Sequence, residues 1–289
     1  MTMDPFLIHF EAYIRLTFFL GFFTILAVWQ NQKINRQLLT PLKTRWMRHF
    51  SLLVMGTACV RLVFYTILPL AIAVAVSKKK IGLFNMPEFA FLSYWGQVIV
   101  GVILLDLVIY LQHRTFHRVS LAWRFHKMHH SDKELDVSTG IRFHPIELVI
   151  SMGVKILAIA FIAPPVLAVL IFEILLNGAS LFTHTNVKIP DKIDKILRYF
   201  IVTPTMHRIH HSDIPSEHNS NFGFLFSIWD KWFSTYTAAP KMGHSQMNIG
   251  LVDYQDPKYQ TVKVMLWTPF ERTKKYVPKK TKTHMSVPP

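Results

Sequence analysis

Residues 113–130 read HRTFHRVSLAWRFHKMHH and place five histidines within a short stretch of the chain. They are His113, His117, His126, His129 and His130. Later in the chain, residues 207–213 read HRIHHSD and repeat the H-x-x-H-H-S-D pattern of residues 126–132. The histidines of this repeat are His207, His210 and His211. Two copies of one pattern indicate a specific site rather than a general enrichment in histidine.

The spacing of these histidines predicts that each set stands on one face of a helix. His113 and His117 are four residues apart, and each later set follows the spacing i, i+3, i+4. Residues at these spacings share a helical face. Neutral imidazole is a common ligand for Fe, Zn, Cu and Ni. Eight imidazoles are too many for one ion, so the sequence predicts two metal ions. The alternative is a set of solvated histidine-rich turns, but tracts of biased composition do not repeat a helical spacing three times.

The combined pattern H-x3-H, H-x2-H-H, H-x2-H-H resembles the fatty acid hydroxylase (sterol desaturase) superfamily of integral-membrane, non-haem di-iron oxygenases. Flanking residues agree with this resemblance. They are DLVIYLQHRTFH at 106–117, WRFHKMHHSD at 123–132, IRFHPIE at 141–147, and NSNFG followed by SIWDKWFSTY within 219–236. The resemblance covers residues 95–240, about half of the chain. The motifs are specific for the superfamily, but they say little about which substrate the protein uses.

The resemblance implies two iron ions, O2 as a co-substrate and a ninth metal ligand. His184 fills the position of a single histidine that completes the ligand set in membrane alkane hydroxylases. Some relatives carry another histidine four residues later, where this chain has Lys188. A site with ten histidines is therefore not expected, and no catalytic residue beyond the metal ligands is predicted.

Several polar residues near the histidines are predicted to support the ligands from outside. Asp106 and Tyr110 precede His113 on the same helical face and are expected to orient a histidine; the alternative for Asp106 is pairing at the membrane interface. His144 lacks a histidine partner four residues away, so it is assigned to support of the site or to a helix start. The remaining predicted supporting residues are Glu147 and Asn186, the latter as a hydrogen-bond partner of a metal-bound water.

The rest of the chain reads as a membrane protein. It is 51% hydrophobic, with a mean hydropathy of +0.27 and 23 phenylalanines. The apolar runs are residues 6–29, 51–77, 89–111 and 146–183, the last broken at Pro164-Pro165. They predict an all-α, polytopic membrane helical bundle with a cytosolic helical histidine-rich cap. The fourth run is interpreted as two short helices, which either cross the membrane or form a re-entrant hairpin.

Charge predicts the orientation and excludes nucleic acid as a partner. Basic residues without acids fill the polar stretch 31–49, which places it in the cytoplasm by the positive-inside rule; Lys78–Lys80 weaken this orientation. The net charge of +15 fits anionic lipid better than nucleic acid in a chain with long apolar runs. Cys59 is the only cysteine, so no disulfide or iron–sulfur site is expected. No cleavable signal is expected, because the start lacks a basic region and a small-residue cleavage site.

Three domains and several individual features are predicted. The domains are transmembrane helices at 1–112, the di-iron catalytic domain at 113–240 and a basic, flexible tail at 241–289. Glu11 and Arg15 are expected to pair, Arg61 to extend toward the cytoplasmic side, and Ser120 to cap a helix. Residues 187–205 are predicted to form an amphipathic interfacial helix, and the aromatic residues of 222–236 to pack the cap onto the membrane. The other histidines, namely His9, His218, His244 and His284, are assigned no role at the metal site.

The predicted function is O2-dependent hydroxylation, or desaturation, of a lipid or sterol-like substrate from the bilayer. Hydroxylation is favoured only by the superfamily resemblance. The alternative is a zinc-dependent membrane hydrolase or a metal-binding membrane protein, although hydrolytic zinc sites usually have only three protein ligands. The sequence contains no recognisable electron-transfer domain. Electrons are therefore expected from a separate donor of the ferredoxin or cytochrome b5 type with its reductase.

Overall fold

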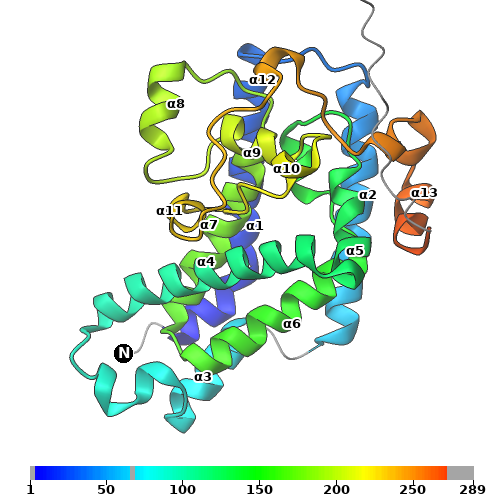
Figure 1. Cartoon of the computed structure of the whole chain (residues 1–289). Coiled ribbons are helices and arrows are strands. Elements are labelled where there is room, and N and C mark those ends of the chain that lie inside the picture. Colours follow the sequence, from blue (N-terminus) through cyan, green and yellow to red (C-terminus); the bar gives the residue numbers. More distant parts are fainter. Residues whose placement is uncertain (1–3, 66–68, 272–289) are drawn as a thin grey trace, which may run out of the picture.

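The computed structural model describes residues 4–65 and 69–271, and over these residues the protein is all-α (Figure 1). The longer helices are α1 (Asp4–Gln32), α2 (Leu42–Val63), α3 (Pro69–Lys79), α4 (Tyr94–Arg118), α5 (Ser120–His130), α6 (Pro145–Ile162) and α7 (Val166–His184). The shorter ones are α8 (Asp191–Leu197), α9 (Pro204–His210), α10 (Pro215–His218), α11 (Ile228–Trp232), α12 (Gly243–Gln246) and α13 (Val262–Trp267). Short 3-10 turns, including η3 (Val137–Ile141) and η6 (Thr268–Phe270), join them. The predicted all-α class is confirmed.

Among the described residues, four helices are long and apolar enough to cross a membrane: α1 from Phe6, α4, α6 and α7. They correspond to the predicted runs 6–29, 89–111 and 146–183. The last run divides where predicted, because α6 ends at Ile162 and α7 begins directly after Pro164-Pro165. Proline lacks the backbone N–H that a helix interior needs, so it ends one helix and can precede the next.

The second predicted run, 51–77, and the polar stretch 31–49 differ from expectation. The helix α2 already begins at Leu42 and ends at Val63, and α3 begins separately at Pro69. Two turns of the predicted loop are therefore helical, and the predicted single span is divided at the proline. Residues 66–68 lie outside the described part of the chain. Arg61 is exposed in the last turn of α2.

The helix α7 lies at the centre of the molecule. It packs against α1, α3, α4 and α9, and the core between α4, α6 and α7 contains Leu105, Ile159 and Phe172. Figure 1 shows α1 and α7 side by side, with α2 standing apart in a similar direction and α4 crossing them. Gly140 lets η3 approach α7 closely, because a Cβ there would lie 2.6 Å from the Ser180 carbonyl oxygen. The central helix thus carries His184 from the bundle into the cap.

Ion pairs connect α1, α6 and α7 inside the bundle. Arg15 pairs with Glu11 at 2.8 Å, as predicted, and also with Glu173 at 2.8 Å. Lys155 contacts the other oxygen of Glu173 at 2.7 Å. Two carboxylates and two cations therefore neutralise one another, which is the arrangement that buried charge requires.

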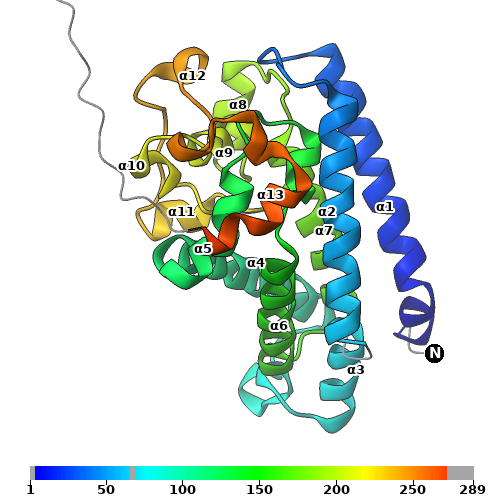
Figure 2. The ribbon, with the colours of Figure 1, turned by 90° about the vertical axis from the view of Figure 1, so that its right-hand side faces the viewer.

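Two segments near the cap are packed differently from the predictions. Only α8 forms within 187–205, because Pro190 and Pro204 each precede or begin a new helix and divide the stretch. Within the predicted tail, α13 and η6 lie against α2 and α5 rather than forming a free tail (Figure 2). Arg124 donates to the Pro269 carbonyl at 2.8 Å, and Met265 is buried beside Leu52 and Met128. The remainder of the predicted tail, with His284, lies outside the described residues.

Candidate metal centre

Four helix ends meet in the cap and bring nine histidines together. The last two turns of α4 carry His113 and His117, and α5 ends on three histidines. The helix α7 ends at His184, and α9 with the next residue carries the last three. Among the described residues their nitrogens form two groups, each with ligand atoms within 4.8 Å of one another. Group one is His113, His117, His126, His130 and His210, and group two is His129, His184, His207 and His211.

The two H-x-x-H-H segments are divided between the groups in opposite ways. On α5, His126 and His130 belong to group one, and His129 belongs to group two. On α9, the pair with the same spacing, His207 and His211, belongs to group two, and His210 belongs to group one. Each segment therefore contributes to both groups.

The distances within each group fit a bound metal ion. In group one, His113 Nε2 lies 3.1 Å from His126 Nε2 and 3.0 Å from His210 Nε2. In group two, His184 Nε2 lies 3.1 Å from Nε2 of both His129 and His207. Ligands at about 2.1 Å from one ion are separated by roughly 3.0–3.4 Å in octahedral or tetrahedral geometry. The nitrogens thus have the spacing of ligands around a common centre.

Acceptors on the outer side of the rings fix which nitrogen points inward. His113 Nδ1 donates to the Phe222 carbonyl at 2.7 Å, and His126 Nδ1 contacts Glu147 Oε1 at 2.6 Å. Backbone carbonyls accept from Nδ1 of three more histidines: His129 to Arg142 at 3.1 Å, His184 to Ser180 at 2.7 Å, and His210 to Ser220 at 2.7 Å. A proton held on Nδ1 leaves the Nε2 lone pair free for a metal.

Burial keeps these rings neutral. Burial is the largest cause that lowers the pKa of His129, His130, His207, His210 and His211 well below the usual value, and repulsion from neighbouring histidines adds to it. A neutral imidazole is the form that binds metal. Water is also excluded, because the side chains of both groups are buried apart from the half-buried His117.

Of the predicted supporting residues, only Glu147 contacts a histidine of the two groups among the described residues. The others contact different partners from those expected. Among the described contacts, Asp106 touches no histidine, because its carboxylate accepts from the N–H groups of Leu225 and Phe226 and from the Trp229 indole. Tyr110 pairs with the Thr235 hydroxyl at 2.8 Å. Both residues point at the segment 225–235 around α11 and not at an imidazole.

His144 and Asn186 also have structural roles. His144 Nδ1 accepts from the Ile146 N–H and caps α6, so the helix-start alternative describes it. The amide of Asn186 pairs in both directions with the backbone of Arg36, at 3.1 Å and 2.6 Å. It therefore fastens the α1–α2 connection to the end of α7, and is not free to face a metal-bound water.

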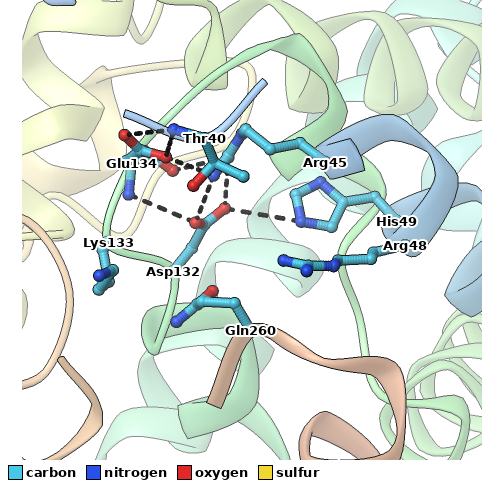
Figure 3. Close-up of a pocket in the computed structure, with 8 residues that line it drawn as sticks. All are labelled: Thr40, Arg45, Arg48, His49, Asp132, Lys133, Glu134 and Gln260. Carbon is cyan, nitrogen blue, oxygen red and sulfur yellow. Dashed lines mark hydrogen bonds and ion pairs between the residues drawn. The ribbon is translucent and has the colours of Figure 1, made fainter. Parts of the chain in front are cut away.

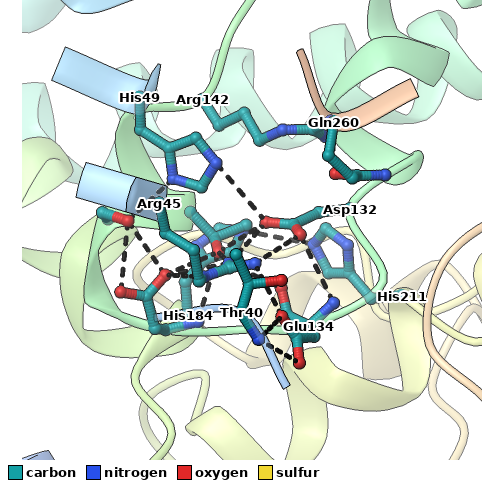
Figure 4. A network of polar contacts seen from close by, with 12 residues as sticks. Thr40, Arg45, His49, Asp132, Glu134, Arg142, His184, His211 and Gln260 are labelled. Carbon is teal, nitrogen blue, oxygen red and sulfur yellow. Dashed lines mark hydrogen bonds and ion pairs between the residues drawn. The ribbon is translucent and has the colours of Figure 1, made fainter. Parts of the chain in front are cut away.

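A buried polar network, which the sequence analysis does not predict, adjoins group two (Figures 3 and 4). Arg45 lies at its centre and pairs with Asp132 at 2.8 Å and with Asp136 at 2.9 Å. His49 Nδ1 shares a hydrogen bond of 2.7 Å with Ser138. A recess of about 10 Å³, the size of one water, opens beside Asp132. In the sequence, only the Ser131-Asp132 pair that follows the first H-x-x-H-H segment pointed to this network.

The end of α5 is held by another buried cation. The Arg142 guanidinium donates to the His129 carbonyl at 2.9 Å and to the Met128 carbonyl. Burial lowers the pKa of Arg142 to about 10, so it stays protonated at neutral pH. The last carbonyls of a helix have no partner within the helix, and a cation there satisfies them. Arg142 thereby fixes the helix end that presents His129 and His130.

His218 lies closer to the histidines than the sequence suggested. Its ring stacks on Trp123 with centroids 5.7 Å apart and an angle of 13°, and it lies 6.4 Å from His117. Its Nδ1 contacts the Ser212 carbonyl at 3.2 Å. His218 and Trp123 thus form an outer wall of group one, while His218 belongs to neither group.

Comparison with known proteins assigns the region that contains both groups. Residues 98–235 match the family model described as Fatty acid hydroxylase. The ornithine lipid hydroxylase OlsE of Rhizobium tropici is 30% identical over 153 residues, which are 53% of this chain and 45% of that protein. The alkylglycerol monooxygenase of Homo sapiens is 31% identical over 159 residues, 54% of this chain and 33% of that protein.

A further match is the alkylglycerol monooxygenase of Caenorhabditis elegans, which is 31% identical over 137 residues, 46% of this chain and 25% of that protein. No solved structure matches the chain at a significant level. The chain spans less than half of the length of each of these relatives. The family match contains every histidine of the two groups and also Glu147, whereas Arg45 precedes it.

Proposed function

Since residues 98–235 form a fatty acid hydroxylase domain, we propose that the chain is a membrane-bound di-iron oxygenase that hydroxylates a lipid with O2. The observation that carries the proposal is the pair of histidine groups at the cap ends of α4 and α7, two apolar helices. A bound iron pair supplies the oxidant, formed from O2, that can attack an unactivated C–H bond. The balanced reaction takes RH, O2, two electrons and two protons to ROH and water.

The protein's own residues hold, orient and shield this centre. Neutral imidazoles present Nε2 inward, and Glu147 together with backbone carbonyls keeps the protons on the outer nitrogens. Burial keeps bulk water from the reacting carbon. Zinc hydrolysis is the weaker alternative, since a hydrolytic zinc site usually has three protein ligands and an open position.

The substrate that we propose is a lipid with a long apolar chain. The relatives are named for action on an ornithine lipid and on alkylglycerols, which share an apolar chain and a polar head. Four apolar helices would hold this chain in a bilayer as a multi-pass protein and admit the lipid from the side. A separate ferredoxin or cytochrome b5 type donor would supply the electrons.

We also propose that the histidines face the cytoplasm. The basic connection between α1 and α2 and the first turn of α2 both contact the cap directly, because Arg36 pairs with Asn186 and Arg45 with Asp132. The connection and the histidines are therefore on one side of the bundle, and the positive-inside rule assigns that side to the cytoplasm. Reporter fusions after residues 40 and 240 should both report cytoplasm, and a split result would contradict the proposed topology.

The decisive test is incorporation of labelled oxygen. The purified protein would be incubated in lipid vesicles with ¹⁸O2, a reductase system and membrane lipids, and one labelled atom is expected in the product. A new double bond without label would replace hydroxylation by desaturation. A product labelled only from water, or turnover with zinc in place of iron, would overturn the oxygenase proposal.

A further inference from the structure

One loop supplies the outer acceptors for two histidines of group one. His113 on α4 donates to the Phe222 carbonyl, and His210 on α9 donates to the Ser220 carbonyl, each at 2.7 Å. The two helices are far apart in sequence, yet their histidine rings donate to backbone carbonyls only two residues apart. The position of this loop, residues 220–223, therefore fixes both rings together.

Asp230 holds the Phe222 peptide from the opposite side. Its Oδ1 accepts from the Phe222 N–H at 2.8 Å, and its Oδ2 accepts from the Gly223 N–H at 2.9 Å. The Thr235 hydroxyl donates to Oδ1 at 2.7 Å. Asp230 is completely buried, so no water replaces these bonds. The backbone of Phe222 is thus held on both sides: Asp230 accepts from its N–H, and His113 donates to its carbonyl.

The approach is close enough to require glycine after Phe222. A Cβ at Gly223 would lie 3.0 Å from Asp230 Oδ2 and 2.9 Å from a methyl carbon of Val202. The segment that follows this loop is tied to α4 as well, because Asp106 accepts from the Phe226 N–H and the Trp229 indole. Two buried carboxylates, those of Asp106 and Asp230, therefore hold this part of the backbone. Among the described contacts, neither of them touches a histidine.

We infer that Asp230 is a positioning residue for group one, which sets the orientation and tautomer of His113 through the Phe222 peptide and steadies His210 through the same loop. The inference rests on the proposed metal binding by group one. Residues that orient a ligand from outside affect metal affinity by about 10- to 100-fold. Asp230→Asn keeps the size of the side chain but turns an NH2 group toward one of the two N–H donors, so one of these bonds is lost.

The test measures Co²⁺ binding to each group separately. A His207→Ala/His211→Ala background leaves only two histidines in group two, and a His113→Ala/His126→Ala/His210→Ala background leaves only two in group one, so each retains one complete group. We expect Asp230→Asn to weaken Co²⁺ binding about 10- to 100-fold in the first background and to leave it unchanged in the second. The visible absorption of Co²⁺ should also shift in the first background alone, because the ligand geometry changes.

A matched control separates positioning from folding. Asp194→Asn removes another buried carboxylate of the cap, which pairs with Arg198 at 2.7 Å and, among the described contacts, touches no histidine of either group. It should lower thermal stability without changing Co²⁺ affinity in either background. If Asp230→Asn fails to accumulate, Thr235→Val removes the hydroxyl that donates to Asp230 and pairs with Tyr110, and should give a smaller weakening in group one alone.

The experiment distinguishes failure of the Asp230 inference from failure of the proposed function. Equal Co²⁺ affinity with and without Asp230→Asn in the group-one background, or equal weakening in both backgrounds, would overturn the inference. A parent protein that binds no metal at group one would overturn the proposed function instead.

Discussion

His130 and His211 stack with ring centroids 4.5 Å apart and an angle of 17° between the planes, although they belong to different nitrogen groups. Each ring directly follows a histidine of the other group in the chain. Consecutive residues on a helix point about 100° apart, so adjacent histidines naturally face two neighbouring centres. The stacked pair is therefore a wall shared by two sites rather than part of one large site.

Neighbouring substitutions at His210 and His211 should affect different sites. His210→Ala removes a group-one nitrogen, and His211→Ala removes a group-two nitrogen. We expect each variant to lower bound iron by about one ion per chain relative to the parent, with metal analysis of gently purified protein as the measurement. His218→Gln, outside both groups, serves as the control. Unchanged iron content in both variants would contradict the assignment of the groups.

Removal of the Glu147 carboxylate should weaken group one. Its Oε1 lies 2.6 Å from His126 Nδ1 and is the only side-chain carboxylate in contact with a group histidine among the described residues. Glu147→Gln should weaken metal binding at group one by about 10- to 100-fold, measured by competition with a chelator. Glu88→Gln changes an exposed glutamate and should have no effect. Equal affinities in the two variants would exclude an orienting role for Glu147.

Loss of Arg45 should destabilise the cap. Arg45→Met leaves Asp132 and Asp136 buried without their cation, which costs about 3–5 kcal/mol in comparable pairs. The free energy of unfolding, measured by denaturant titration in detergent, should fall by that amount. Lys43→Met, an exposed position in the same first turn of α2, should leave it within about 0.5 kcal/mol. A small effect of Arg45→Met would mean that water stabilises the two carboxylates.

The buried charges of the bundle make a second prediction about stability. Glu173→Gln leaves Lys155 and Arg15 without their shared carboxylate and should lower the resistance of the protein to unfolding by SDS. Glu11→Gln should have a smaller effect, because Glu11 is partly exposed and Arg15 keeps Glu173. The reverse order would show that Arg15 depends mainly on Glu11.

Acidification should destabilise the protein through histidines outside the two groups. Burial lowers the pKa of His49 to about 3 and of His244 to about 4, so both are neutral in the folded protein at pH 5. In the unfolded chain they bind protons below about pH 6.5. The unfolded state then binds more protons, and stability falls as the pH drops from 7 to 5.

The contribution of His49 can be isolated by substitution. His49→Gln retains a hydrogen-bonding partner for Ser138 and removes one titrating group. The melting temperature in detergent, measured at pH 7 and pH 5, should therefore depend less on pH in this variant than in the parent. An equal dependence would show that the His49 ring does not titrate differently in the folded and unfolded states.

The sequence by itself determined the features that depend on local spacing. The i, i+3, i+4 pattern placed the histidines at helix faces, and the apolar runs with Pro164-Pro165 located α1, α4, α6 and α7, because helix periodicity and the missing proline N–H act within a few residues. His184 was identified by its position at the end of the last apolar run, near the final histidine cluster, and by the resemblance. Glu147, 17 residues after His130, was predicted to support the site, but its contact with His126 could not be predicted.

Only the tertiary structure decided which histidines share a centre. The segments at 126–130 and 207–211 have identical spacing, yet they are divided between the groups in opposite ways, because α5 and α9 approach the centre from different directions. The same holds for Asp230, whose partners become visible only when the loop folds back, and for Arg45, which looked like a residue of a basic loop. Hydrogen bonds between residues far apart in sequence depend on how helices pack, and local patterns carry no information about that packing.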